Sequence, residues 1–270
     1  MKYLIACDLD GTLLNKNHEI SQETLIILRQ LAHDGHMVVI TTGRPHHAAI
    51  HYYNQLDLDM PFITDNGGSI EHPRNPNFKP VRESIPLDIF HNLFTQVEPI
   101  ISSAVYTSNG VAYAYKYQRE LEWLFSGAYA YKLIEKDFRD LEVSPCGVVF
   151  LVENKHNTNL EQILDNEFSE HLNYRFWGND DIYSVYEVYL KHLSKAKALD
   201  FLLQYYGLKK DQLIAIGDGI NDVEMIGFAS VGVAMKNAVD EVKQVADYET
   251  HHDHDNHGAA LFFKDFFHIK

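Results

Sequence analysis

The chain has 270 residues, enough for one large domain or two of moderate size. Its formal net charge of −15 at pH 7 disfavours nucleic acid and anionic membranes as partners, and no apolar run approaches the ~20 residues of a membrane-spanning helix. Two cysteines far apart in the sequence, and an N-terminus too short for a signal peptide before Asp8, favour a cytoplasmic protein.

The N-terminal part of the chain alternates strands with helices. The expected elements are a strand over 2–8, a helix over 21–33, a strand over 37–41, a helix over 46–56 and a short strand over 62–64. Such alternation is typical of a parallel sheet with right-handed crossovers. This part therefore predicts an α/β fold.

The middle of the chain is rich in tyrosine, phenylalanine and hairpin signals. Helices are expected over 86–97 and about 160–171, and strands over 103–107, 111–117, 148–152, 173–177 and 183–189. The pair Asn109-Gly110 between the first two of these strands is a strong signal for a hairpin turn. We therefore predict a separate α+β domain inserted into the sheet domain.

The alternation of strand and helix resumes towards the C-terminus. The expected elements are a helix over 194–206, strands over 213–216 and 230–234, and a closing segment over 259–267. The predicted domain division assigns residues 1–82 and 190–270 to the α/β domain and residues 83–189 to the insertion.

Two aspartates mark the end of the first predicted strand. Asp8 and Asp10 start on the same face of the chain because residues two apart in a strand point the same way, and Gly11 then breaks the strand. Ligands of open α/β sheets bind at the carboxyl ends of strands. One carboxylate could attack a substrate while the other transfers a proton. Taken alone, the pair is equally compatible with an ordinary surface turn.

More polar stretches fall at the same predicted edge, and together they are Asp8/Asp10, Thr42, Lys195 and Asp218/Asp222. Several aspartates in one pocket repel each other unless a cation is present, and oxygen ligands with room for water suit Mg²⁺. Lys195 adds a positive charge and Thr42 a hydroxyl donor. This set of groups suits the binding of a phosphoryl group.

These stretches resemble the four signature motifs of the haloacid dehalogenase-like (HAD) hydrolase superfamily. The motifs are DLDGTL (residues 8–13), TGRP (42–45), LSK (193–195) and GDGIND (217–222), and their order and spacing match. The insertion resembles the C2-type cap of the Cof-type (subclass IIB) phosphatases, as do NGG (66–68) and GVAMKNA (232–238). The resemblance implies a Rossmann-like parallel-sheet core with an inserted α+β cap of the C2B type, which selects the substrate.

The resemblance also implies roles for residues of the motifs. Asp8 would be the nucleophile that forms an aspartyl-phosphate, and Asp10 would protonate the leaving oxygen and then activate water. Phosphate or substrate would be bound by Thr42, Gly43, Arg44, Lys195 and Asn221. Thr41 is a rival for the hydroxyl role, and Thr42 is preferred because the residue in this role directly precedes glycine in the family.

A metal site is implied by the same resemblance. Mg²⁺ would be bound by the carboxylates of Asp8 and Asp218 and by the main-chain carbonyl of Asp10, and Asp222 would support these ligands. The expected activity is a Mg²⁺-dependent phosphatase acting on a small phosphorylated metabolite: a sugar phosphate, a nucleotide or a phosphorylated cofactor. The alternatives are a phosphosugar mutase and a non-enzymatic phospho-acceptor or metabolite sensor. The presence of Asp10 argues against the phospho-acceptor or sensor only.

Other conspicuous residues receive ordinary structural interpretations. Cys7 is expected in the core, and so are the aromatic side chains of Trp123, Tyr186 and Tyr189. The histidines between His251 and His257 match no closed zinc site, and we interpret the segment as a loop before the last helix. The sequence does not indicate an oligomeric state.

Overall fold

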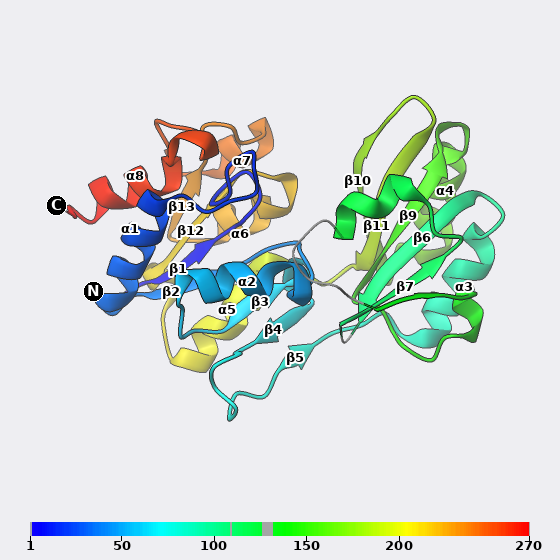
Figure 1. Ribbon diagram of the computed structural model, residues 1–270, viewed down its shortest axis with the longest axis horizontal. Helices are drawn as coiled ribbons and strands as arrows, with labels where there is room; N and C mark the ends of the chain where they lie inside the picture. Colours follow the sequence, from blue (N-terminus) through cyan, green and yellow to red (C-terminus); the bar gives the residue numbers. More distant parts are fainter. Residues whose placement is uncertain (1, 109, 126–131, 270) are drawn as a thin grey trace. The chain divides into compact units, whose positions relative to one another are not determined.

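The computed structural model describes residues 2–108, 110–125 and 132–269, so the predicted turn residue Asn109 lies outside the described residues. The chain divides into two compact units, one formed by Met1–Val81 with Ser194–Lys270 and the other by Arg82–Leu193 (Figure 1). Each unit has its own cluster of buried hydrophobic side chains. Within the described ranges, no helix has the length and apolar character needed to cross a bilayer.

The first unit is built on a five-stranded parallel sheet. Its strand order is β14 (Tyr248–Glu249), β13 (Val231–Ala234), β12 (Leu213–Gly217), β1 (Leu4–Cys7) and β2 (Met37–Ile40). The central strand β1 pairs in parallel with β12 on one side and β2 on the other, and all of its residues are buried. The predicted α/β core is confirmed.

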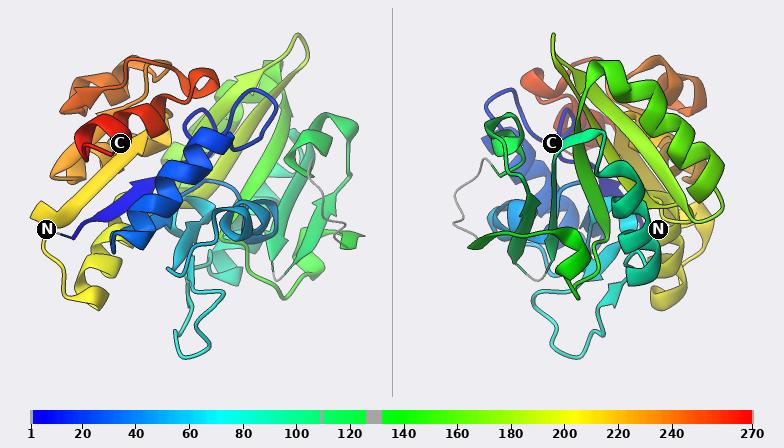
Figure 2. Two further views of the ribbon diagram at one scale, coloured as in Figure 1. Left: turned by 60° about the vertical axis from the view of Figure 1, so that its left-hand side comes forward. Right: turned by 90° about the vertical axis from the view of Figure 1, so that its right-hand side faces the viewer.

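Helices cover both faces of this sheet. From β1 the chain crosses to β2 at one edge of the sheet, and from β12 it crosses to β13 towards the other edge. Because both crossovers are right-handed, their helices α1 (Gln22–His33) and α6 (Val223–Phe228) lie on opposite faces of the sheet. Next to α1 lies α8 (Gly258–Phe266), and next to α6 lie α5 (Lys195–Tyr206) and α7 (Asp240–Val245) (Figure 2). The remaining helix, α2 (His46–Leu56), contacts α1 and β3 (Phe62–Thr64).

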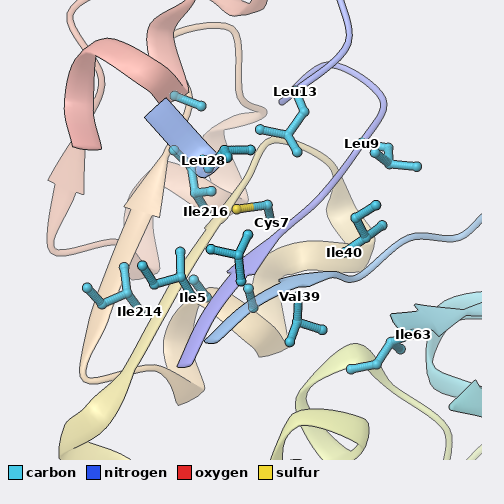
Figure 3. Close-up of a cluster of buried hydrophobic side chains, with 14 of the residues drawn as sticks. Ile5, Cys7, Leu9, Leu13, Leu28, Val39, Ile40, Ile63, Ile214 and Ile216 are labelled. Atoms are coloured by element: carbon cyan, nitrogen blue, oxygen red, sulfur yellow. The ribbon is translucent and has the colours of Figure 1, made fainter. Parts of the chain in front are cut away.

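The core of this unit holds the central strands rigidly. Ile5 and Cys7 of β1 lie among Ile214, Ile216 and Leu28, all with at most 1% exposure (Figure 3). Burial of such aliphatic side chains contributes about 1.5–3 kcal/mol each. Cys7 is a free thiol, and its burial raises its pKa, so it acts here as a small neutral core side chain. The buried packing of β1 therefore fixes the position from which the following segment, with Asp8 and Asp10, begins.

A short sheet follows α2 in the chain. It has the strand order β3, β4 (Ser69–Glu71) and β5 (Val81–Arg82), and β3 pairs with β4 in antiparallel fashion. The 3₁₀ turn Asp65–Gly67 joins β3 to β4, and Asn66 within it has a φ of 55°. The sequence predicted β3 but not the two strands after it.

The second unit is an α+β domain with a six-stranded sheet. The strand order is β10 (Leu172–Asn179), β11 (Tyr183–Leu190), β9 (Gly147–Glu153), β6 (Ile101–Ser108), β7 (Val111–Tyr115) and β8 (Lys132–Glu135). Phe90 and Phe94 of α3 (Leu87–Val97) and Leu160 of α4 (Asn157–Ile163) share a core with Phe150 and Tyr186 of the sheet. Both helices therefore cover the same sheet face, and the predicted α+β insertion is confirmed.

The prediction that α4 extends to residue 171 is wrong. A π-helical segment, Leu164–Phe168, continues α4, and the helical conformation ends there. Phe168 is buried in the core of this unit, and β10 begins at Leu172. The short stretch between these two residues must reverse the chain, which leaves no room for a last helical turn.

Candidate active site

The segment after β1 forms a tight turn. The amide of Asp8 donates to the carbonyl of Ile216 at 3.1 Å, which extends the sheet pairing by one residue. The carbonyl of Leu9 then accepts from the amides of residues 12–14, and Gly11 has a φ of +75°. As a result, the Asp8 side chain is 7% exposed while that of Asp10 is 48% exposed. Two neighbouring carboxylates thus lie in very different environments.

Lys195 lies at the centre of the buried part of the site. It is the first residue of α5, whose N-cap Ser194 accepts a hydrogen bond from the amide of Lys197. Its ammonium donates to Asp8 Oδ1 at 2.5 Å and to Asp222 Oδ1 at 2.6 Å, with the lysine side chain 0% exposed. Burial alone lowers the pKa of Lys195, but Asp222 and Asp8 outweigh it and raise this pKa, so the ammonium stays charged.

Asp222 uses both carboxylate oxygens within the protein. Oδ1 accepts from Lys195, and Oδ2 accepts from the amides of Asp218 and Gly219, each at 3.0 Å. A Cβ on Gly217 would lie 2.5 Å from Asp222 Cγ, so glycine is needed there. Asp222 therefore fixes the turn after β12, and with it the position of Asp218.

Asp218 lies against the turn that follows β1. Thr12 Oγ1 donates to Asp218 Oδ1 at 2.7 Å, and a Cβ on Gly11 would lie only 2.2 Å from Oδ2. Burial raises the pKa of Asp218 to about 7, with Asp222 adding to the rise and the Thr12 hydrogen bond opposing it. Burial also raises the pKa of Asp8 well above its usual range, although Lys195 opposes the rise.

Three carboxylates come together at this edge of the sheet. Asp8, Asp218 and Asp222 each offer an oxygen, and these oxygens lie within 4.8 Å of one another. Among the described residues, no other group of three histidine, cysteine, aspartate or glutamate side chains is arranged in this way, and none of the histidines between His251 and His257 joins one. Lys195 offsets only part of the repulsion. A divalent cation with oxygen ligands would offset the rest, so the donor set fits Mg²⁺.

The turn after β2 brings the second motif to the same edge. The Thr42 hydroxyl accepts from the amide of Arg44 at 3.1 Å, whereas the Thr41 hydroxyl is buried without a hydrogen-bond partner among the described residues. A Cβ on Gly43 would lie 3.0 Å from Asn66 Oδ1, which accepts from Asn221 Nδ2 at 2.9 Å. Gly43 and Asn221 thus lie close together, and Asn66 joins them.

Arg44 is engaged by Asp10. Its Nε donates to Asp10 Oδ2 at 2.7 Å and its Nη2 to Oδ1 at 2.6 Å. His18 Nδ1 lies 3.3 Å from Arg44 Nη2 and 3.6 Å from Asp10 Oδ1. This group forms a half-exposed rim beside the buried cluster around Lys195.

Comparison with known proteins identifies the family of the chain. The family profile described as haloacid dehalogenase-like hydrolase matches residues 5–263. The chain belongs to the haloacid dehalogenase-like hydrolases. It is 32% identical, over 98% of its own length and 97% of the relative's, to the 5-amino-6-(5-phospho-D-ribitylamino)uracil phosphatase YitU of Bacillus subtilis. It is also 30% identical to an HMP-PP phosphatase of Serratia proteamaculans, over 91% and 88% of the two chains.

Solved structures agree with this assignment. A haloacid dehalogenase-like hydrolase from Bacteroides thetaiotaomicron superposes with a TM-score of 0.84 at 25% identity, covering 99% of this chain and 100% of that one. The subclass IIB sugar phosphatase BT4131 shares the fold, with a TM-score of 0.81 at 21% identity and 100% coverage of both chains. The predicted Cof-type HAD membership is confirmed, and the protein is a phosphatase of this family.

Three residues of this HAD phosphatase received no role from the sequence. Thr12 orients Asp218, and Asn66 holds Asn221. Asn237 donates to the carbonyl of Gly11 at 2.8 Å and accepts from the amide of His254 at 3.1 Å. Thr12, Asn66 and Asn237 all lie inside the stretches on which the family resemblance rests, and that was the available signal.

The aromatic residues expected in the core of the second unit differ in their surroundings. Tyr186 is 1% exposed and donates to Glu161 at 2.7 Å, as expected for a core residue. Tyr189 is only partly buried, and the guanidinium of Arg175 lies 5.0 Å from its ring centroid. Arg175 also donates to Glu187 at 3.0 Å. The side chain of Trp123 lies outside the described part of the chain.

Proposed function

We propose that this HAD phosphatase hydrolyses a phosphate ester of a small metabolite through a covalent intermediate on Asp8. The observation that supports this most strongly is the buried Asp8 carboxylate, held by a charged Lys195 beside Asp218. Asp8 would attack phosphorus, and the bond from phosphorus to the ester oxygen would break. Asp10 would give that oxygen a proton, then take one from the water that attacks the aspartyl-phosphate. The products are the alcohol and inorganic phosphate, with Asp8 regenerated.

The remaining site residues would bind and orient the phosphoryl group. Lys195 supplies a fixed positive charge, and Asn221 an amide held by Asn66. The Thr42 hydroxyl accepts from the Arg44 amide, so its hydrogen can donate to a phosphoryl oxygen, and Gly43 keeps this turn free of a side chain. Donors fixed in a water-poor site stabilise the charge of the transition state without reorganisation.

Mg²⁺ is the proposed cofactor. Asp8, Asp218 and the main-chain carbonyl of Asp10 would hold it, and Asp222 would support Asp218 through the hydrogen bond that it accepts from the Asp218 amide. Bound Mg²⁺ supplies positive charge that neutralises the phosphoryl oxygens and the clustered carboxylates. The raised pKa values of Asp8 and Asp218 give the metal a further role, because a protonated Asp8 is a poor nucleophile.

The second unit is proposed to act as the cap that selects the substrate. The sequence places the cap boundaries at residues 82/83 and 189/190, and the compact unit runs from Arg82 to Leu193. The relatives provide the first candidates, because YitU is named for 5-amino-6-(5-phospho-D-ribitylamino)uracil and another relative for HMP-PP. Both are small phosphorylated compounds. A cytoplasmic location, and the absence of nucleic-acid and membrane partners, stay predictions.

Phosphate release tests the proposal directly. Wild type and Asp8→Asn would be incubated, with and without Mg²⁺, with a panel that includes 5-amino-6-(5-phospho-D-ribitylamino)uracil, a 5′-nucleotide, D-ribose 5-phosphate and 4-nitrophenyl phosphate. We expect release by wild type that requires Mg²⁺ and disappears in Asp8→Asn. An isomerised sugar phosphate with little free phosphate would instead indicate a mutase. Asp8 that stays phosphorylated for minutes would indicate a sensor.

A further inference from the structure

Both oxygens of the Asp10 carboxylate are held by one guanidinium. Arg44 donates from Nε and Nη2 to the two oxygens of Asp10 at 2.7 and 2.6 Å, in the fork geometry that matches arginine to a carboxylate. The sequence placed Arg44 among the groups that bind phosphate or substrate. In the structure, Nε and Nη2 of Arg44 both donate to Asp10, the residue proposed to act first as acid and then as base.

The surroundings of Arg44 fix its direction. Its guanidinium carbon lies 5.5 Å from the centroid of the Tyr52 ring, in a cation–π arrangement, and its side chain is only 19% exposed. The Tyr52 hydroxyl donates to the carbonyl of His18 at 2.8 Å, and His18 lies beside both Arg44 and Asp10. Tyr52 is itself 4% exposed. A buried ring thus supports the guanidinium and anchors the loop beside it.

The Asp10 side chain would otherwise be mobile. It is 48% exposed, unlike the buried Asp8 two residues earlier, and among the described residues the basic side chains within 4 Å of it are Arg44 and His18. Proton transfer requires the donor oxygen within about 2.6–3.2 Å of the acceptor, so a carboxylate that samples several rotamers transfers protons poorly. A two-point contact with a fixed guanidinium removes that freedom.

We propose that Arg44 is a positioning residue, which fixes the Asp10 carboxylate for proton transfer and does not bind the phosphoryl group. The inference rests on the proposed function, because it assigns Arg44 to the acid–base step of that reaction. Arg44 acts through Asp10, and in the first step, the attack of Asp8, its contribution depends on how much the leaving oxygen needs a proton. An alkoxide leaving group needs one, and 4-nitrophenolate does not.

The test compares two leaving groups in Arg44→Gln. The alkyl phosphate that wild type hydrolyses fastest is expected to lose about 10²-fold in kcat with little change in KM, because general acid–base help is worth roughly 10²–10⁴. The first-turnover release of 4-nitrophenolate, which reports only the attack of Asp8, is expected to slow less than about 3-fold, since this leaving group departs without a proton. The later attack of water, which needs Asp10 as base for either substrate, does not contribute to this first release. Arg44→Lys, which keeps the charge but loses the fork, is expected to stay near Arg44→Gln.

The chain contains a matched control. Arg74 Nη2 lies 2.6 Å from Asp57 Oδ1, and its guanidinium carbon lies 5.8 Å from the centroid of the Tyr53 ring. Arg74→Gln therefore removes an Arg–Asp pair over a tyrosine without touching Asp10, and both substrates should turn over as in wild type. Thermal unfolding of each variant shows whether it is folded.

A double-mutant cycle decides between positioning and phosphate binding. In Asp10→Asn, measured with enzyme in excess on the alkyl phosphate, adding Arg44→Gln should cause no further loss. Equal losses in the first-turnover release of the leaving group on both substrates, a raised KM, or a further loss in the Asp10→Asn background would overturn the proposal. Failure of the proposed function has a different signature, namely no Mg²⁺-dependent release by wild type or equal release by Asp8→Asn.

Discussion

The site contains two ion-pair groups that differ in depth. In the inner group, Lys195 lies between Asp8 and Asp222 at 2.5 and 2.6 Å, and each side chain is at most 7% exposed. In the rim group, Arg44 contacts Asp10 at similar distances, but the carboxylate is 48% exposed. The distance between the charged atoms therefore does not by itself indicate how much an ion pair contributes to stability. Solvent screens the rim group, whereas removal of one partner from the inner group leaves buried charge behind.

The largest effect is expected for the inner cation. Lys195→Met would leave Asp8 and Asp222 buried without their counter-charge, at a cost of about 3–5 kcal/mol in the free energy of unfolding. Phosphate release should fall at least ~10³-fold, because the proposed donor to the phosphoryl group is also lost. Urea unfolding and phosphate release measure the two effects.

Lys243 offers the matched control for Lys195. Its ammonium lies 3.1 Å from Glu249 Oε1, but that carboxylate side chain is 50% exposed. Lys243→Met should therefore cost less than about 1 kcal/mol and leave phosphate release unchanged. Similar stability losses in the two methionine variants would contradict the comparison of depth.

The next effect concerns the turn that separates the two groups. A Cβ in Gly11→Ala would lie 2.2 Å from Asp218 Oδ2, so the carboxylate must move away. We expect Mg²⁺-dependent release to fall about 10²-fold, in line with the loss of one fixed electrostatic group, and more Mg²⁺ to be needed for half-maximal rate.

Gly207→Ala is the control for Gly11→Ala. Gly207 also has a positive φ, +65°, but a Cβ at this position would meet no other atom of the described chain within 4 Å. The two alanine variants therefore share the backbone strain and differ in the contact with Asp218. If Gly207→Ala impaired activity equally, backbone strain rather than that contact would be the cause.

The inner group should also make stability depend on pH in metal-free protein. The pKa of Asp218 is raised from its usual value near 4 to about 7, so between these values the folded chain holds a proton that the unfolded chain has lost. The free energy of unfolding should therefore fall, by on the order of 3 kcal/mol, as the pH rises from about 4 to about 7. Urea unfolding in EDTA measures this slope, and Asp218→Asn should flatten it. An unchanged slope in Asp218→Asn would assign it to other groups.

The smallest effect is expected at the outer side of the rim. His18→Ala removes a side chain that is 67% exposed and lies 3.6 Å from Asp10, while the bidentate contact with Arg44 stays intact. Turnover of an alkyl phosphate should change less than about 3-fold, and stability by less than about 1 kcal/mol. A loss as large as that of Arg44→Gln would show that His18, and not the guanidinium, sets the position of Asp10.

The sequence predicted the parallel core and the residues of the inner group because both depend on strong local patterns. Buried strands such as β1 and β12 are apolar runs that end directly in the aspartate motifs. The short strands β4, β5 and β14 escaped prediction, because each has only two or three residues, too few to show a periodic hydrophobic pattern.

The rim group shows the limit of motif-based prediction. The motif TGRP marks Arg44 as part of the site but does not say which group the guanidinium contacts. That choice depends on Tyr52, which lies on α2, and on His18, which lies in the loop before α1. Neither belongs to a signature motif. The partner of a long, flexible side chain is set by the packing around it, which the local sequence does not encode.

The pairing of β1 has a consequence for biosynthesis. Leu4 in the first strand pairs with Leu213, beyond the entire second unit. During translation, one edge of β1 therefore stays unpaired until β12 has left the ribosome. The segment Arg82–Leu193 is continuous and has its own hydrophobic core, so it can fold earlier. The turn that carries Asp8 is among the first parts to be translated and among the last to acquire its final form. Nascent chains that stall before residue 213 should expose an apolar strand edge, a preferred target for chaperones.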